Sequence, residues 1–310
     1  MYKRQAVSER GVKAVLEPYA KELEALGEPF QWVDKDALKS KIGSDHFTAA
    51  VFTPGGALLN PAALTRGLAD NLPSNVTLYE NSPVIESNFQ NGIHLTTNQG
   101  SLRAPKMILA ANGYSEQFGF YPRRFMHLIA HGSLTRPLNE AERNAYGVEQ
   151  PWGLTPANAF AGITMRYTND HRLLIRQGIT YCPSRTISKA EQGTIQRRHK
   201  ALFDQRFPML PAVEMEHTWS GILCLSQNSA PGFGKLASNV WSAVCQNAVG
   251  VTKGTFGGTL AADLATGRDN PLIDDMMSLG EPSILPPRPF LDIGIRSRFA
   301  WELWSNRHEA

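Results

Sequence analysis

One stretch of the sequence decides how the fold is interpreted: Cys245-Gln246-Asn247-Ala248-Val249-Gly250-Val251-Thr252-Lys253-Gly254-Thr255-Phe256-Gly257-Gly258-Thr259-Leu260-Ala261-Ala262-Asp263-Leu264. The five residues before it, Val240–Val244, are short, apolar and partly β-branched, which predicts a buried strand. Near its end, the apolar residues 260, 261 and 264 begin a helical pattern that stops at Gly267. The sequence therefore predicts a strand, a turn of small residues and a helix.

The small residues of this turn are suited to a ligand that lies close to the backbone. Gly250 and Gly254 have no Cβ, so a flat molecule can approach them. The free N–H groups in the first turn of a helix carry partial positive charge and favour an electron-rich oxygen. A glycine-rich turn that only packs a helix on a sheet would have the same composition, and the residues alone leave both interpretations open.

Composition limits the class of protein. The chain has 310 residues, 42% of them hydrophobic, enough for one large or two medium domains with a real core. A net charge of +3 is too small to indicate a nucleic-acid partner. No apolar run approaches the roughly 18 residues of a membrane span, and no signal peptide opens the chain. The three separated cysteines, Cys182, Cys224 and Cys245, indicate reduced thiols in a cytoplasmic protein.

Apolar periodicity predicts the elements of the first third of the chain. Residues 1–27 are expected to form one amphipathic helix, and Asp34 to cap a short helix that ends at Gly43. A helix is predicted at 61–72 and a hairpin around Asn98-Gln99-Gly100. Strands are predicted at 30–33, 76–79, 84–87 and 106–111, and a strand followed by a turn at 49–60.

The middle of the chain, residues 120–233, is richer in strand patterns. Strands are predicted at 125–133, 162–166, 173–176 and 214–219, with one clear helix at 192–207. The tail after Gly267 contains Pro286-Pro287-Arg288-Pro289 and then an aromatic and basic stretch. We expect this tail to pack on the body of the protein.

Two passages carry a resemblance to a known family. The first is the strand–turn–helix of 240–264, and the second is Lys106-Met107-Ile108-Leu109-Ala110-Ala111-Asn112-Gly113-Tyr114-Ser115, an apolar strand that ends in small residues. Together they resemble the D-amino acid oxidase and glycine oxidase superfamily of FAD-dependent amine oxidoreductases. The γ-glutamylputrescine oxidase-like branch is the most similar, and its Cys-Asn-Gly-His/Val-Gly-Val turn is here Cys-Gln-Asn-Ala-Val-Gly-Val. Asn247, Ala248 and Asn112 depart from the small residues usual in the family.

The resemblance implies an α/β (α+β) fold with two parts. A Rossmann-like FAD-binding domain would be formed by residues 1–27, 49–115 and 234–270. An antiparallel-sheet substrate domain, residues 28–48 and 116–233, would be inserted into it, with 271–310 as the tail. The family begins with a strand, a Gly-x-Gly-x-x-Gly turn and a helix that hold the FAD pyrophosphate. This sequence contains no such motif, so the FAD-binding domain is expected to be incomplete at its N-terminus and residues 1–310 alone to bind FAD poorly.

The resemblance also implies where FAD would bind, without a covalent bond. Val84 matches the position whose backbone contacts adenine, and Ala110, Ala111 and Gly113 match the strand tip beside the dinucleotide. The family's covalent attachment position falls near Gly221 and not at Cys224. The flavin ring would be contacted by Asn247, Val249, Gly250, Val251, Thr252 and Lys253.

The implied reaction is oxidation of a small-molecule amine or amino acid, with hydride transfer to flavin and peroxide formed from oxygen. Trp219 and Tyr167 are predicted to line the substrate pocket because aromatic walls hold cationic amines well, although both could equally belong to the core of the sheet. No catalytic acid or base is identified. His127 and His131 have metal-ligand spacing, but no third ligand lies near them in the sequence, and no metal site is predicted.

Several alternatives stay open at this point. The chain could be a remnant or scaffold that keeps the fold without retaining FAD. A nicotinamide-dependent enzyme is disfavoured because its phosphate-binding turn is missing. Peripheral membrane contact through the tail is a minor alternative. The sequence does not determine the substrate or the oligomeric state.

Overall fold

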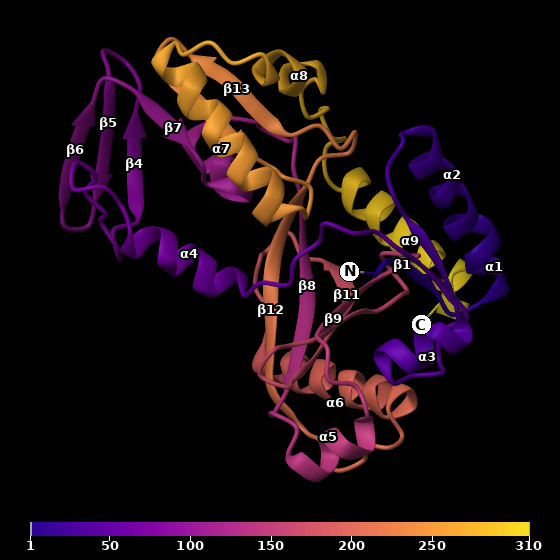
Figure 1. Ribbon diagram of the computed structural model, residues 1–310. Helices are drawn as coiled ribbons and strands as arrows, with labels where there is room; N and C mark the ends of the chain where they lie inside the picture. The colour runs from indigo at the N-terminus through magenta and orange to yellow at the C-terminus, as the bar shows by residue number, and fades with distance from the viewer. Residues whose placement is uncertain (1, 310) are drawn as a thin grey trace. The chain divides into compact units, whose positions relative to one another are not determined.

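The computed structural model describes residues 2–309, which form two compact units, each built from several segments of the chain. Unit 1 contains the residues up to 58, residues 129–222 and those from 292 onward; unit 2 contains residues 59–128 and 223–291. Both contain helices and strands (Figure 1), and the predicted α/β fold is confirmed.

Unit 1 is built around an eight-stranded sheet of order β12-β8-β11-β10-β9-β1-β3-β2. The strands are β1 (Tyr2–Ala6), β2 (Gln31–Asp34), β3 (Ala49–Phe52), β8 (Met126–Thr135), β9 (Trp152–Pro156), β10 (Thr164–Tyr167), β11 (Leu173–Tyr181) and β12 (Met215–Leu225). The last residues of β12 and the first of β8 belong to unit 2. The pairings of β10 with β9 and β11 are antiparallel, whereas β1 runs parallel to β9.

Helices pack on this sheet and bury its core. They are α1 (Glu9–Gly11), η1 (Val12–Leu16), α2 (Glu17–Ala25), α3 (Lys35–Ile42), α5 (Glu140–Tyr146), α6 (Lys189–Arg206), α9 (Phe290–Ser305) and η3 (Arg307–Glu309). Leu38 of α3 and Phe203 of α6 join Ile175 of β11 in one fully buried cluster. Asp34 caps α3 by accepting a hydrogen bond from the Ala37 N–H at 2.9 Å, and the helix ends at left-handed Gly43, as the sequence predicts.

The prediction that residues 1–27 form a single helix is wrong at its start. Residues 2–6 are strand β1, which pairs antiparallel with β3 and parallel with β9. The strand is stabilised by partner strands that are distant in the sequence, and local apolar periodicity does not reveal such partners. The helical part begins after Ser8, whose hydroxyl accepts a hydrogen bond from the Gly11 N–H at 3.1 Å. Val12, Leu16 and Leu23 then pack on β1 and β3.

Unit 2 contains two three-stranded sheets, of order β13-β14-β7 and β4-β5-β6. Its strands are β4 (Val84–Asn88), β5 (Ile93–Thr97), β6 (Gly100–Ala104), β7 (Met107–Leu109), β13 (Gly232–Ala237) and β14 (Val240–Val244). Its helices are α4 (Pro61–Asp70), η2 (Asn112–Phe118), α7 (Gly250–Thr266) and α8 (Leu272–Ser278). The helix α7 lies along the β13-β14-β7 sheet (Figure 1), and Leu260 and Ala261 of α7 are buried with Ala243 of β14.

Two local predictions in unit 2 need correction. Residues 76–79 form no strand, because no other strand pairs with them; Val76, Leu78 and Tyr79 are exposed. The helix predicted to begin near Leu260 begins at Gly250. Its first ten residues are helical although several are glycines, whose propensity for helix is low. A Cβ built at Gly257 would lie 3.8 Å from the Ala243 Cβ of β14, so this part of the helix packs on the sheet.

The predicted division into an FAD-binding and a substrate domain stays a proposal beside these two units. Residues 76–87, 106–111 and 240–244 lie together in unit 2. Residues 1–27 and 49–58, predicted for the same domain, lie instead in unit 1, because β1 and β3 belong to its large sheet.

In the tail, Glu309 accepts hydrogen bonds from the backbone N–H groups of Val7, at 3.0 Å, and Ser8, at 3.2 Å.

Candidate functional site

The candidate site begins where two parallel strands of unit 2 end. The strands β7 and β14 pair in parallel with the register Val240 to Met107 and Ser242 to Leu109. All five residues of β14 are buried. Because the carboxyl ends of parallel strands meet at one edge of a sheet, the segments 110–113 and 245–249 leave the sheet side by side. Ligands of open α/β sheets bind at such edges.

A side-chain hydrogen bond ties the two segments together. The Asn112 Oδ1 accepts a hydrogen bond from the Cys245 N–H at 3.0 Å. Asn112 has φ 48°, a left-handed conformation that asparagine tolerates better than most residues. Next to it, Gly113 is buried, and its carbonyl bonds the Nε2 of His127 at 2.8 Å. A Cβ at Gly113 would lie 3.0 Å from the His127 ring, so the glycine permits this contact.

The turn between β14 and α7 has an unusual backbone. Cys245, Asn247 and Ala248 all have positive φ, at 55°, 50° and 65°. Such conformations are costly for residues with a Cβ and persist only where surrounding contacts hold them.

Asn247 provides these contacts. Its Oδ1 accepts a hydrogen bond from the Ser226 N–H at 2.9 Å, and its Nδ2 donates to the carbonyl oxygens of Ser229 at 3.0 Å and Cys245 at 3.1 Å. The Asn247 side chain is thus engaged in shaping the turn, and a contact with FAD through its backbone stays a prediction.

The helix α7 begins at this turn without a side-chain cap. Val249 occupies the N-cap position, and its side chain makes no capping hydrogen bond. The N–H groups of the first helical residues have no carbonyl partner within a helix, and Gly250, Val251 and Thr252 are exposed. A Cβ built at Gly250 or Gly254 meets nothing within 4 Å. The helix start therefore offers donors, partial positive charge and open space to a ligand.

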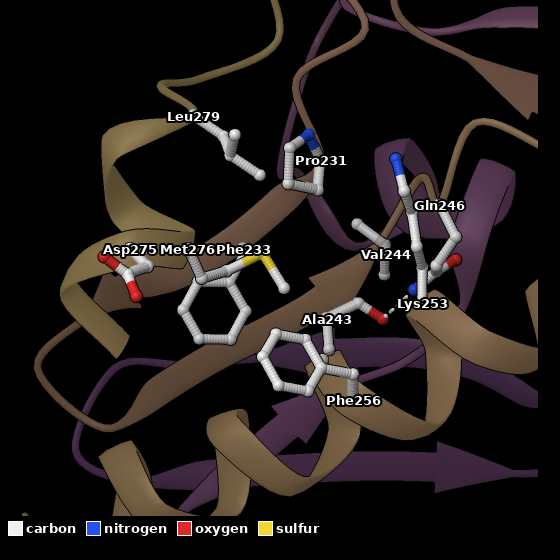
Figure 2. A pocket seen from close by; sticks show the side chains of 11 residues that line it. Pro231, Phe233, Ala243, Val244, Gln246, Lys253, Phe256, Asp275, Met276 and Leu279 are labelled. Carbon is white, nitrogen blue, oxygen red and sulfur yellow. Dashed lines mark hydrogen bonds between the residues drawn. The ribbon is translucent and has the colours of Figure 1, made fainter. Parts of the chain in front are cut away.

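A pocket of about 300 Å³ lies beside this helix start (Figure 2). Phe233, Phe256 and Met276 form apolar walls, and Lys253 and Asp275 bring opposite charges to it. It is also lined by Pro231, Ala243, Val244, Gln246, Gly257 and Leu279. Of the residues predicted to contact FAD, only Lys253 lines this pocket. Val251 and Thr252 line a different hollow, with Leu260 and Leu272.

The structure brings some predicted cofactor residues together and leaves others apart. Ala110, Ala111 and Gly113 follow β7, and residues 247–253 follow β14, so both groups lie at the shared strand edge. Val84 lies in β4 of the other sheet, where it pairs with Thr97 and is half-buried.

The two residues predicted to line the substrate pocket differ in how far they are buried. Tyr167 is fully buried in the core of unit 1, where its hydroxyl bonds the Nδ1 of His171 at 3.0 Å and its ring lies edge-on to Tyr146. This burial fits the alternative that Tyr167 belongs to the core of the sheet, and a contact with substrate stays a prediction. Trp219 of β12 is 42% exposed and packs against Gly132. It stays a candidate for contact with substrate.

The histidines with metal-ligand spacing are bound by protein groups instead. His131 bonds the Ser220 Oγ at 2.9 Å and the Thr180 Oγ1 at 3.0 Å, and burial lowers the pKa of its ring. His127 bonds the Gly113 carbonyl. Within residues 2–309, no group of three or more His, Cys, Asp or Glu side chains could hold a metal ion.

Sequence reasoning missed the linking roles of Asn112 and His127. The signal for Asn112 was its position between a strand end and Gly113, where a left-handed residue is needed. His127 carried no local signal, because its partner lies in another segment.

The sequence is similar to those of known oxidoreductases. A model of the family described as FAD dependent oxidoreductase (DAO) matches residues 5–264. The chain is 24% identical over 306 residues to a probable oxidoreductase, OrdL, of Haemophilus influenzae. It is 26% identical over 258 residues to the γ-glutamylputrescine oxidoreductase of Escherichia coli. These matches cover 95% and 82% of the chain but only 67% and 59% of the relatives, so the chain spans about three fifths to two thirds of their length.

Solved structures show the same fold. Glycine oxidase from Geobacillus kaustophilus superposes with a TM-score of 0.69 at 20% identity, over 86% of this chain and 71% of that one. L-Proline dehydrogenase from P. horikoshii gives a TM-score of 0.70 at 15% identity, over 87% and 72%. Among the described residues, no helix has the length and apolar character needed to cross a membrane. The family match over most of the sequence, together with this fold, shows that the chain belongs to the DAO family of FAD-dependent oxidoreductases.

Proposed function

We propose that the protein is an FAD-dependent oxidoreductase that oxidises the C–N bond of an amine or amino acid of the γ-glutamylputrescine type, with oxygen as acceptor and hydrogen peroxide as product. The observation that carries the proposal is the shared edge of β7 and β14, where the uncapped start of α7 faces open space. The relative named γ-glutamylputrescine oxidoreductase supports the substrate class.

The residues at this edge fit FAD in chemical terms. The N–H groups of Gly250, Val251 and Thr252 would donate to an oxygen of the flavin ring, and the helix dipole would favour negative charge there. Ala110 and Ala111 would allow the dinucleotide to lie against backbone. Val84 would contact adenine, as the resemblance implies. We propose non-covalent binding, because Gly221 offers no side chain for attachment.

Bound FAD would supply the acceptor for the hydride removed from the carbon next to the substrate nitrogen. The protein's own contribution is electrostatic and positional. Donors that are already oriented at the start of α7 stabilise negative charge without reorganising during the reaction. Lys253, two residues beyond Val251, adds positive charge beside them. Trp219 would provide an aromatic face for a cationic amine.

The proposal is tested with the protein expressed from its complete reading frame. We expect a visible flavin absorption band, release of the flavin into the supernatant after acid precipitation, and oxygen consumption on addition of γ-glutamylputrescine. Flavin retained in the pellet would contradict non-covalent binding. A protein that shows no flavin band even with added FAD would contradict the proposal and favour a non-catalytic scaffold. A protein that binds flavin but shows no turnover with the amine would contradict only the proposed substrate class and leave the proposed cofactor in place.

A further inference from the structure

Two cysteines meet beneath the turn that leads to α7. Cys224 lies near the end of β12 and Cys245 directly follows β14, and both are reduced and buried, with 3% and 0% of their surface exposed. The Cys245 thiol lies 3.8 Å from the Cys224 carbonyl oxygen. They form one apolar cluster with Tyr121, Phe125 and Val244.

The two thiols belong to one packed cluster, and their pKa values shift in opposite directions. A hydrogen bond with Cys224 is the main cause that lowers the pKa of the Cys245 thiol; the Ser226 hydroxyl and backbone groups of Asn247 and Ser226 act in the same direction. The pKa of the Cys224 thiol is raised, first by its hydrogen bond with Cys245 and then by burial. The negative charge of a thiolate is therefore better placed on Cys245, with Cys224 as its protonated partner.

We propose that Cys224 and Cys245 are a redox-modification site, a dithiol that hydrogen peroxide converts into an intramolecular disulfide. In the first step the Cys245 thiolate attacks one peroxide oxygen, the O–O bond breaks, and sulfenic acid and hydroxide form. In the second step the Cys224 sulfur attacks the Cys245 sulfur, the S–O bond breaks, and the proton of the Cys224 thiol leaves with the hydroxyl as water. Overall, two thiols are oxidised and one peroxide is reduced to two waters.

The position of the pair gives the modification a consequence. The Cys245 Sγ lies 3.8 Å from the Cys224 carbonyl oxygen and both side chains belong to one packed cluster, so a local adjustment would bring the sulfurs to the S–S bond length of about 2.05 Å. Ala248 and Val249, which follow Cys245 closely, are exposed, so the buried pair adjoins a surface turn. A Cβ at Gly113 would lie 3.5 Å from the Cys224 Cβ, which places the pair beside the predicted dinucleotide segment. A disulfide would covalently fix the turn that begins α7.

The test treats the folded protein with hydrogen peroxide and follows intact mass and free thiols. We expect a loss of two hydrogens, about 2 Da, and peptide mapping that joins Cys224 to Cys245. This product should form at least about ten-fold faster than any oxidation of Cys182, and Cys182→Ser should leave it unchanged. The same treatment in urea should abolish the selectivity, because the thiolate at Cys245 is stabilised only by the folded structure.

Single variants distinguish the cysteine that peroxide attacks, Cys245, from the cysteine that completes the disulfide, Cys224. In Cys224→Ala, Cys245 should stop at sulfenic acid, which dimedone traps; in Cys245→Ala, Cys224 should stay reduced. Circular dichroism establishes that each variant is folded. A native parent protein in which Cys182 oxidises first, or in which Cys224 and Cys245 both stay reduced, overturns the proposal whatever the variants do. The experiment uses no flavin or amine, so this outcome would leave the proposed enzymatic function untouched.

Discussion

At the scale of single residues, the proposed flavin site at the start of α7 depends on the open space around one glycine. Gly250 follows a turn with left-handed residues, and no described atom fills the space beside it. If that space holds the flavin ring, a branched side chain would compete with the ligand and not with the protein. The fold itself would tolerate the change, because Gly250 has ordinary helical backbone and an open surrounding.

The corresponding prediction concerns Gly250→Val in the flavin-binding protein from the complete reading frame. We expect flavin content per polypeptide to fall at least about ten-fold, with a change in unfolding free energy below about 1 kcal/mol. The matched control is Gly258→Val, since Gly258 lies in the same helix and is equally open but about two turns away from the strand edge. Equal flavin content in the two variants would remove Gly250 from the site.

At the scale of elements, the structure separates what local sequence determines from what distant partners determine. The strand at 240–244, the capped helix after Asp34 and the hairpin around Gly100 were predicted correctly because their signals are local. The strand β1 was missed because β3 and β9 select it. Likewise, residues 76–79 have strand composition but no pairing partner, so composition alone misled the prediction.

The candidate site was predictable to a similar extent. The sequence located the segments 110–113 and 247–253, because small residues after apolar strands are a local pattern. It did not reveal the Asn112 bond to Cys245, which depends on the parallel register of β7 and β14. It also left Tyr167 open between a pocket wall and the core, because an aromatic residue in a strand gives the same sequence pattern in either place.

The helix α7 gives an element-scale prediction. A Cβ at Gly258 would meet nothing within 4 Å, so Gly258→Ala should stabilise the protein by about 0.5–1 kcal/mol through helix propensity alone. Gly257 instead packs against Ala243, and Gly257→Leu should destabilise it by about 1–3 kcal/mol by forcing α7 from the sheet. Urea unfolding measures both. Similar effects of the two substitutions would contradict the packing of α7 on β14.

At the scale of the whole molecule, buried histidines make stability depend on pH. Burial lowers the pKa of both His131 and His199 in unit 1. The unfolded chain, with histidine pKa near about 6.5, therefore binds protons more readily than the folded one below that pH. Their contribution to stability is complete above about pH 6.5 and is lost as pH falls through the lowered values.

We accordingly expect the free energy of unfolding to fall between about pH 7 and pH 5, because the unfolded chain takes up more protons than the folded one. Urea titrations across this range measure the slope. His199→Gln should reduce the slope, even if it lowers stability at neutral pH. A slope that is the same in parent and His199→Gln would show that burial of His199 does not couple folding to protonation.

An FAD site at the shared edge of β7 and β14 can be detected by amide hydrogen exchange with and without FAD. The protein from its complete reading frame is compared with its FAD-stripped form. We predict that FAD slows exchange in peptides covering 110–113 and 247–254, while the helix α6 in unit 1 exchanges at the same rate in both. Protection elsewhere in the chain, with 247–254 exchanging equally fast in both forms, would contradict a flavin site at this edge.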